Sequence, residues 1–280
     1  MSRPARLDAE LLKSFPLPRL AEDGDKEDRG RALVIGGSRE VPGAAILAGV
    51  AALRAGAGKL QIATEESVAA VIGAAVPEAR IVSGSPLAHV AEAQSVTLGC
   101  GMTPGPGLDR LLAELLGCGA AIPLVLDAAA LGSLPAVAQQ VRAWRGGVAL
   151  LPHAGEMARL LECDSAEVGI DPLAAVRRAA ERYRAVALLK GGCSFIAAPD
   201  GRAFCFEGGG VGLATSGSGD VLAGIVGGLA ARGADALTAM LWGVRLHGEA
   251  GRILTKEVGR VGFLAREISE LVPRLLEGAV

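Results

Sequence analysis

The sequence predicts an α/β protein in three layers, with a mostly parallel central sheet and helices on both of its faces. Short, apolar, β-branched segments such as residues 31–37 and 122–128 alternate with longer segments of helical periodicity, a pattern typical of successive strand–helix–strand units. No long linker and no internal repeat divides the 280 residues. We therefore expect a single domain over residues 1–280, in which residues 1–30 form an N-terminal extension that includes a charged loop.

The individual elements follow from the same patterns. The apolar runs predict strands over residues 31–37, 59–64, 79–84, 95–101, 122–128, 146–153 and 185–192. Helical spacing of apolar residues predicts helices over 42–58, 66–76, 108–119, 155–163 and 171–183. Residues 193–209 predict an antiparallel hairpin that turns at Pro199-Asp200-Gly201. Nearly all of the chain beyond the hairpin is expected to be helical.

Composition excludes several classes of protein. The formal net charge is -2 and aromatic residues make up 3 % of the chain, which argues against a nucleic-acid-binding surface. The N-terminus lacks the apolar core of a signal peptide, and the longest apolar runs are about half as long as a membrane span requires. Five cysteines without a CxxC pair indicate reduced thiols. A soluble, cytoplasmic protein is therefore expected.

Two glycine-rich stretches imitate known nucleotide-binding motifs. Residues 55–60 read AGAGKL, but Leu60 stands where a P-loop requires Ser or Thr for magnesium. Residues 99–105 read GCGMTPG, which misses the dinucleotide-binding spacing GxGxxG by one residue. Neither stretch is interpreted as a phosphate-binding motif of its class.

A stronger candidate is the loop over residues 213–220, which reads LATSGSGD and leads into an apolar helix. The first N–H groups of a helix have no partner within it, so Gly217, Ser218 and Gly219 are expected to form an anion site. Asp220 falls in the first turn, where the helix dipole is expected to keep it ionised. An ionised carboxylate beside a bound phosphate can take a proton from a substrate hydroxyl. The structural alternative is an aspartate that only stabilises its own helix terminus.

Two further strand ends carry polar residues. Lys190 precedes Gly191 and Gly192, which suits either a nucleotide phosphate or a lysine that reaches solvent before a tight turn. Asp127 ends another strand and faces either the ligand or the next turn. In open α/β sheets ligands bind outside the carboxyl ends of the strands, so both residues remain candidates.

The three histidines do not predict a metal site. His153 ends a strand and Glu156 lies in the following helix, where it suits the helix dipole. His89 and His247 are too scattered in the sequence to predict a metal cluster with His153, and no HExxH or HxxxH motif occurs.

Taken in order, these segments resemble a known family. The chain contains GGSREVPGAAILAGVAALRAGAGK, LVLDAAAL, PHAGEMARL, LLKGGCSFIAAPDG, LATSGSGDVLAGIVGGLAARG and LHGEAG. Over nearly its whole length it is similar to the ADP-dependent NAD(P)H-hydrate dehydratases of the ribokinase-like superfamily. The GSGD element alone is typical of the superfamily, whereas the early PGAA helix followed by PHAGE and then GSGD is typical of the dehydratases.

The resemblance implies a three-layer ribokinase-like fold and a metabolite-repair reaction that restores hydrated NADH or NADPH while ADP becomes AMP and phosphate. It implies Mg²⁺ as a cofactor, although no metal ligand is assigned, and a homo-oligomer, with a tetramer as one possibility. Asp220 would be the catalytic base and Gly217, Ser218 and Gly219 the anion hole. Nucleotide binding is implied for Lys190, Gly191, Gly192, Cys193, Ser194 and Gly219, and substrate binding for Ala45, Gly101, His153 and Asp220.

The chain departs from the family pattern at five positions. Ala129 replaces a second acid, Leu151 and Ala154 replace Thr and Pro around PHAGE, Gly210 replaces Asn, and Ser216 replaces a common Gly. Two alternatives therefore stay open. One is an ATP-dependent kinase of a small alcohol on the same fold, and the other is a catalytically silent nucleotide-binding protein. The preference between NADH and NADPH is not determined by the sequence.

Overall fold

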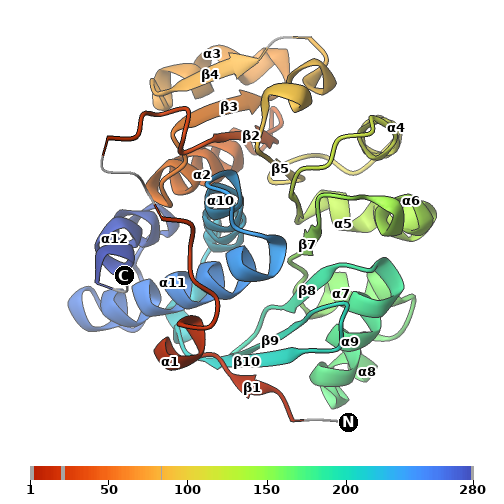
Figure 1. The fold of residues 1–280 in the computed structure, drawn as a ribbon, viewed down its shortest axis with the longest axis vertical. Coiled ribbons are helices and arrows are strands. Elements are labelled where there is room, and N and C mark those ends of the chain that lie inside the picture. Colours follow the sequence, from red (N-terminus) through yellow and green to blue (C-terminus); the bar gives the residue numbers. More distant parts are fainter. Residues whose placement is uncertain (1–2, 20–22, 83, 279–280) are drawn as a thin grey trace.

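The computed structural model describes residues 3–19, 23–82 and 84–278, and these contain one ten-stranded sheet (Figure 1). The strand order is β1-β10-β9-β8-β7-β6-β5-β2-β3-β4. The strands are β1 (Ala5–Arg6), β2 (Arg31–Ile35), β3 (Lys59–Ala63), β4 (Ala79–Val82), β5 (Ser95–Leu98), β6 (Leu124–Leu126), β7 (Val148–Leu150), β8 (Val186–Leu189), β9 (Cys193–Ala197) and β10 (Ala203–Glu207). All neighbouring strands pair in parallel except that β9 is antiparallel to both β8 and β10.

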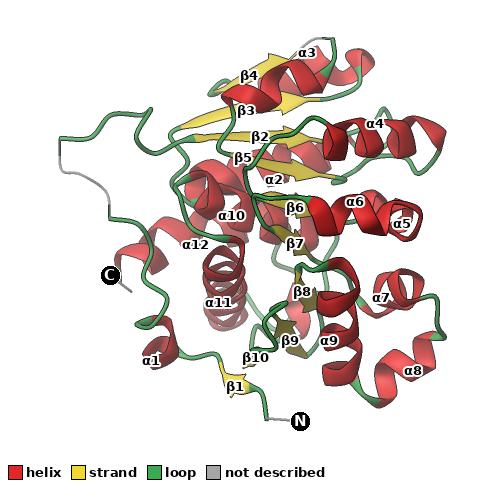
Figure 2. Ribbon diagram, turned by 45° about the vertical axis from the view of Figure 1, so that its right-hand side comes forward, coloured by secondary structure: helices red, strands yellow, loops and turns green. Residues whose placement is uncertain are grey.

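Helices cover both faces of the sheet (Figure 2). On one face lie α2 (Pro42–Arg54), α3 (Glu66–Ala75), α10 (Ser218–Ala231), α11 (Ala236–Glu257) and α12 (Ala265–Glu277). On the other lie α4 (Pro106–Gly117), α5 (Ala129–Ser133), α6 (Ala138–Ala143), α7 (Ala154–Leu161), α8 (Ser165–Ile170) and α9 (Pro172–Tyr183). In β2, Ala32 and Val34 join the first core while Leu33 and Ile35 join the second, because successive side chains of a strand alternate between its faces. The predicted three-layer fold is confirmed.

The predicted strands and long helices form where the sequence placed them, and the hairpin turns as expected. The sequence missed the short elements: α1 (Ala9–Leu12), α5, α6, α8, β1 and the 3₁₀ turns η1 (Pro86–Glu92), η2 (Leu134–Val137) and η3 (Val211–Leu213). Within the N-terminal extension, β1 pairs with β10 and the side chains of Leu7 and Leu12 are buried. The single domain over residues 1–280 stays a prediction. In the described part of the chain, no helix is both long and apolar enough to cross a membrane.

The small residues of α2 and α10 place these two helices in direct backbone contact. A Cβ built on Gly224 would lie 2.1 Å from the Ala48 carbonyl oxygen, and one on Gly228 would lie 2.3 Å from that of Ala52. Such a separation leaves no room for any side chain, so the glycines of α10 are required by packing. This close contact fixes where the N-terminus of α10 meets the sheet.

Gly224→Ala is expected to lower the free energy of unfolding by about 1–3 kcal/mol, because the new methyl group forces α2 and α10 apart. Urea denaturation of the two proteins measures the difference. Gly117→Ala is the matched control, since Gly117 is also helical but a Cβ there meets nothing within 4 Å. A Gly224→Ala protein as stable as this control would show that the helices separate without cost.

Candidate active site

The candidate residues gather at the carboxyl edge of the sheet, where five parallel strands end. Gly37 follows β2 and its N–H donates to the Cys100 carbonyl, 2.8 Å away, in the loop after β5. Asp127 follows β6, and its N–H donates to the Leu98 carbonyl at 3.2 Å. After β7 and β8, His153 and Lys190 extend the parallel pairing by one bridge. Backbone pairing thus holds these loops side by side.

The N-terminus of α10 begins at a glycine and has no side-chain cap among the described residues. Its N-cap is Gly217, whose φ of 85° lies in the left-handed region that favours glycine. The Ser218 N–H donates to the Thr215 carbonyl at 3.2 Å. No side chain of the described residues caps this helix, so the next N–H groups of the turn are the candidates to bind an anion. Gly219 has helical backbone, and a Cβ built there would lie 3.5 Å from Lys190 Nζ and 3.6 Å from Asp127 Oδ2. The exposed edge of this first turn therefore points at a charged cluster.

Asp220 lies in that first turn, and its carboxyl group is more than half buried beside Asp127 and Lys190. Burial, and after it the nearby charge of Asp127, raise the pKa of Asp220 from 3.8 to about 6, while the Cys100 thiol and Lys190 act in the opposite direction. A carboxylate that served only to stabilise its helix would show a lowered pKa. With a pKa of about 6, Asp220 is largely ionised at neutral pH and accepts a proton at slightly lower pH. This behaviour suits a general base.

Lys190 joins two acids from different parts of the chain. Its Nζ lies 2.8 Å from Asp127 Oδ1 and 4.0 Å from Glu156 Oε2. Burial acts to lower the pKa of Lys190, but Asp127 and Glu156 outweigh it, so the pKa is raised. Asp127 makes this ion pair rather than capping α5, whose N-cap is Ala128. The lysine is held charged beside the N-terminus of α10, rather than reaching out to solvent.

His153 begins α7 as part of a capping box. Its Nδ1 accepts a hydrogen bond from the Gly155 N–H at 3.0 Å, while its own N–H donates to Glu156 Oε2 at 2.9 Å. Glu156 therefore caps the helix and faces Lys190 at the same time. The His153 side chain is 56 % exposed, which leaves its outer edge accessible at the rim of the site.

The other residues predicted to contact the substrate differ in exposure. The side chain of Ala45 is fully buried in α2 beneath Gly37, so it shapes the floor of the site without an exposed surface of its own. Gly101 has a φ of 64°, and a Cβ there would lie 2.5 Å from the Val41 carbonyl oxygen. Only a glycine lets this loop approach the start of α2.

The predicted nucleotide-binding loop connects β8 to β9 immediately after Lys190. Gly191 and Gly192 are exposed, and Cys193 and Ser194 are half-buried at the start of β9. The Ser194 hydroxyl donates to the Gly191 carbonyl at 3.5 Å. The loop is thus at the same edge of the sheet as Lys190 and open to solvent.

Two functional candidates escaped sequence reasoning. Cys100 is buried beside Asp220, and burial together with the charges of Asp220 and Asp127 raises the pKa of its thiol well above the usual value. His247, in the LHGEAG segment of α11, lies 2.9 Å from the Ser218 hydroxyl. The one sequence signal for Cys100 was its position directly after a predicted strand. No sequence pattern indicated that His247 contacts Ser218.

The family departures include the loss of one acid, at Ala129, but leave Asp127, Glu156, Lys190 and Asp220 in place. Ala129 begins α5, Leu151 is buried after β7 and Ala154 begins α7. Gly210 has a φ of 76°, a left-handed conformation that asparagine also adopts more readily than other residues. Ser216 is exposed.

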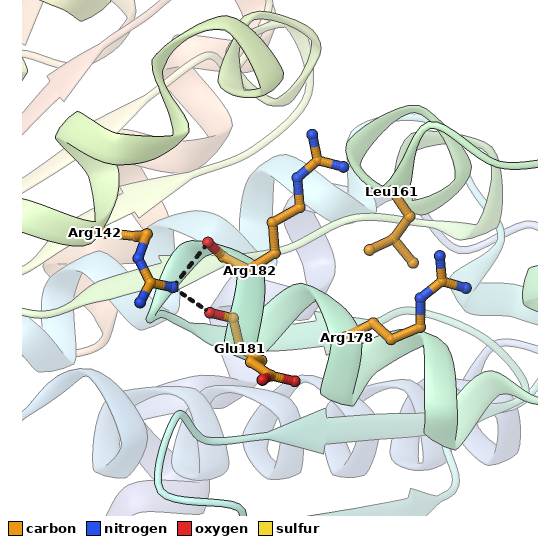
Figure 3. A pocket seen from close by; sticks show the side chains of 5 residues that line it. All are labelled: Arg142, Leu161, Arg178, Glu181 and Arg182. Atoms are coloured by element: carbon orange, nitrogen blue, oxygen red, sulfur yellow. Dashed lines mark hydrogen bonds between the residues drawn. The ribbon is translucent and has the colours of Figure 1, made fainter.

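A cavity of about 400 Å³ lies elsewhere, on the surface formed by α6, α7 and α9 (Figure 3). Its lining includes Arg142, Arg178 and Arg182. Arg142 donates to the carbonyl oxygens of Glu181 and Arg182 at 2.6 and 3.2 Å (Figure 3). These are the last carbonyls of α9, so this arginine satisfies a helix C-terminus, and none of the candidate site residues lines the cavity.

The side chains of the site do not form a metal cage. Among the described residues, no group of three or more His, Cys, Asp or Glu side chains is arranged to hold a metal ion. Asp127 and Glu156 already face Lys190. Any Mg²⁺ would therefore depend for most of its ligands on nucleotide phosphates and water, as is common for this ion.

The fold and the site together define a ribokinase-like α/β protein whose acidic and basic groups gather at the carboxyl edge of its sheet. The chain belongs to the NAD(P)H-hydrate dehydratase family, whose model matches residues 32–274. The resemblance inferred from the sequence motifs is thereby confirmed.

Individual relatives agree with this assignment. The chain is 46 % identical over 283 residues to an ADP-dependent (S)-NAD(P)H-hydrate dehydratase of Xanthomonas campestris, covering 96 % of this chain and 95 % of the relative. A Neisseria meningitidis protein of the same name is 37 % identical and covers 89 % of this chain and 86 % of its own. The crystal structure of the ADP/ATP-dependent NAD(P)H-hydrate dehydratase of Bacillus subtilis, co-crystallised with ATP/Mg²⁺, superimposes with a TM-score of 0.88 at 29 % identity and full coverage of both chains.

Gly219→Val is expected to weaken ADP binding at least tenfold, because the added side chain would project toward Lys190 and Asp127 and occupy the space in front of α10. This is a steric effect, since Gly219 has no positive φ to lose. Calorimetric titration with ADP measures it, and Gly107→Val, at an open helical position, serves as the control. Unchanged ADP affinity in a folded Gly219→Val protein would remove this turn from the nucleotide site.

Proposed function

We propose that this protein is an ADP-dependent (S)-NAD(P)H-hydrate dehydratase, which returns hydrated NADH or NADPH to its active form while ADP becomes AMP and phosphate. Family membership and the 46 % identity to the Xanthomonas protein over almost the whole of both chains support the proposal. The observation that carries it is the position of Asp220: a carboxylate with a pKa of about 6 at an uncapped helix N-terminus, beside a charged lysine.

In this mechanism Asp220 takes the proton from the hydroxyl group on the hydrated ring. The hydroxyl oxygen then attacks the terminal phosphorus of ADP, and AMP leaves. The N–H groups at the start of α10 and the Lys190 ammonium bind the phosphate oxygens as charge develops on them. The phosphate ester formed on the ring then breaks at its carbon–oxygen bond. Phosphate departs, the ring loses one adjacent proton, and the double bond is restored.

Mg²⁺ is expected to accompany the nucleotide and to offset the charge of its phosphates. Because the described residues provide no metal cage, no step above is assigned to the ion. The homo-oligomeric state and the cytoplasmic location expected from the sequence remain part of this proposal, and light scattering coupled to gel filtration measures the first.

The proposal is tested by incubating the protein with hydrated NADH and Mg²⁺, with ADP and ATP compared side by side. ADP is expected to restore NADH absorbance and to yield AMP and phosphate in equal amounts, with ATP clearly poorer. Recovery with ATP alone would contradict the preference for ADP but keep the dehydratase. Failure of both nucleotides, with phosphorylation of an added small alcohol, would establish the kinase alternative. Binding of ADP without any turnover would establish the alternative of a catalytically silent nucleotide-binding protein.

The pH dependence follows from the raised pKa of Asp220. Since the base must be ionised, kcat/KM is expected to fall as the pH falls through about 6. An unshifted aspartate would keep full activity to about pH 4. A rate profile from pH 4.5 to 8.5 with saturating Mg²⁺ distinguishes the two, because an acid limb near 4 would contradict the environment described for Asp220.

A further inference from the structure

His247 contacts two oxygen atoms of Ser218, the first residue of α10. Its Nε2 lies 2.9 Å from the Ser218 hydroxyl oxygen and 3.1 Å from the Ser218 carbonyl oxygen. The contact joins the middle of α11 to the turn that ends in Asp220. No step of the mechanism above uses this histidine.

The two contacts determine which nitrogen of His247 carries its hydrogen. A carbonyl oxygen can only accept a hydrogen bond. An unprotonated Nε2 is also an acceptor, so its lone pair would repel that of the carbonyl oxygen. Nε2 must therefore be the protonated nitrogen, and its N–H is shared between the two oxygens of Ser218. Burial and the charge of Lys190 lower the pKa of His247 to about 4, so the ring is neutral at working pH and Nδ1 is unprotonated.

The start of α10 needs such a support. Glycines flank Ser218 on both sides, its N-cap Gly217 is in the left-handed region, and no described side chain caps the helix. The side chain of Ser218 is buried in this turn. Because His247 contacts both the main-chain carbonyl and the side chain of Ser218, it holds the adjacent N–H groups in one orientation.

We propose that His247 is a positioning residue of the anion site: as the neutral Nε2–H tautomer it holds the carbonyl and hydroxyl oxygens of Ser218, so that the first turn of α10 presents its N–H groups to the terminal phosphate of the nucleotide. This inference rests on the proposed function for the identity of the ligand. Through Ser218 it links the interior of α11 to nucleotide affinity, and the histidine itself does not touch substrate.

The test compares His247→Leu, which removes the donor, with His247→Gln, whose side-chain amide nitrogen keeps one at a similar distance. His247→Leu is expected to raise the Kd for ADP about tenfold, the loss expected from one hydrogen bond in a buried site, with a matching rise in KM. His247→Gln should stay within about threefold of the parent protein. Thr255→Val, in the same helix but bonded to the Gly251 carbonyl, is the control and should leave the Kd unchanged.

A double-mutant cycle with Ser218→Ala separates positioning from general stability. If His247 acts through Ser218, the loss of ADP affinity in the double variant is smaller than the two single losses multiplied together. Unchanged ADP affinity in a folded His247→Leu protein, or fully additive losses, would overturn the proposal. Because ADP binding is measured by calorimetry without hydrated cofactor, this failure is distinct from that of the dehydratase assignment, which would appear as a parent protein that turns over no hydrate.

The tautomer is tested on the unmodified protein, which avoids any question of folding. ¹⁵N-edited NMR of the imidazole is expected to show Nε2 as the protonated nitrogen of His247 between pH 6 and 8. A hydrogen on Nδ1, or a doubly protonated ring in this range, would contradict the proposed clamp.

Discussion

Replacing Asp220 by asparagine is expected to lower kcat about 10²–10⁴-fold, the usual effect of removing a general base, while ADP affinity changes little. Asparagine keeps the volume and the polarity of the side chain but cannot accept the proton of the substrate hydroxyl. Single-turnover measurements with saturating ADP record the loss of rate, and calorimetry on the same samples records the affinity.

The stability of the Asp220→Asn protein separates this role from that of a helix stabiliser. Because folding raises the pKa of Asp220 from 3.8 to about 6, its contribution to stability is fully present below pH 3.8 and is lost as the pH rises through 6. The uncharged asparagine escapes this loss, so the variant is expected to be more stable than the parent at pH 7–8, by an amount on the order of 2 kcal/mol. A less stable variant that retains full activity would identify Asp220 as a structural residue.

Lys190→Met is expected to have the second large effect, on both stability and binding. It leaves the side chains of Asp127 and Glu156, which are 3 % and 10 % exposed, without their cation, and breaking a buried ion pair costs about 3–5 kcal/mol. It also removes a positive charge from the proposed phosphate site, which should weaken ADP binding about ten- to a hundredfold. Denaturation and calorimetry measure the two effects separately.

A second substitution separates the effect of Lys190 on stability from its effect on ADP binding. Asp127→Asn combined with Lys190→Met removes the nearer of the two buried charges left without a cation and should restore part of the lost stability, whereas ADP affinity should stay low. If ADP binds to Lys190→Met as tightly as to the parent protein, Lys190 serves only to neutralise the two acids. The charge of Lys190 also lowers the pKa of Asp220, so any residual activity should show an acid limb at higher pH.

The sequence predicted most of the fold because its strands and helices carry strong local signals. Runs such as residues 122–128 and 185–192 are apolar throughout, as buried parallel strands require. Elements without such a signal were missed. β1 is only two residues long and forms because β10, two hundred residues later, offers it an edge, and α5 and α6 are one or two turns of small and polar residues.

The site was predictable in its loops but not in its contacts. Glycines at Gly217 and Gly219 and the strand ends at Asp127 and Lys190 marked the region. The ion pair between Asp127 and Lys190 depends on β7 lying between β6 and β8 in the sheet, an order that local patterns do not contain. The raised pKa of Asp220 depends in turn on burial and on Asp127, neither of which can be read from the helix position alone.

The most direct test of the account follows the oxygen atom of the substrate. Hydrated NADH carrying ¹⁸O in its ring hydroxyl is incubated with the protein, ADP and Mg²⁺, and the products are analysed by mass spectrometry. If Asp220 activates that hydroxyl for attack on the terminal phosphorus of ADP, the label appears in the released phosphate, one ¹⁸O for each NADH restored. Label found in water, with unlabelled phosphate, would show that the ring loses its hydroxyl without phosphorylation and would contradict the mechanism assigned to this site.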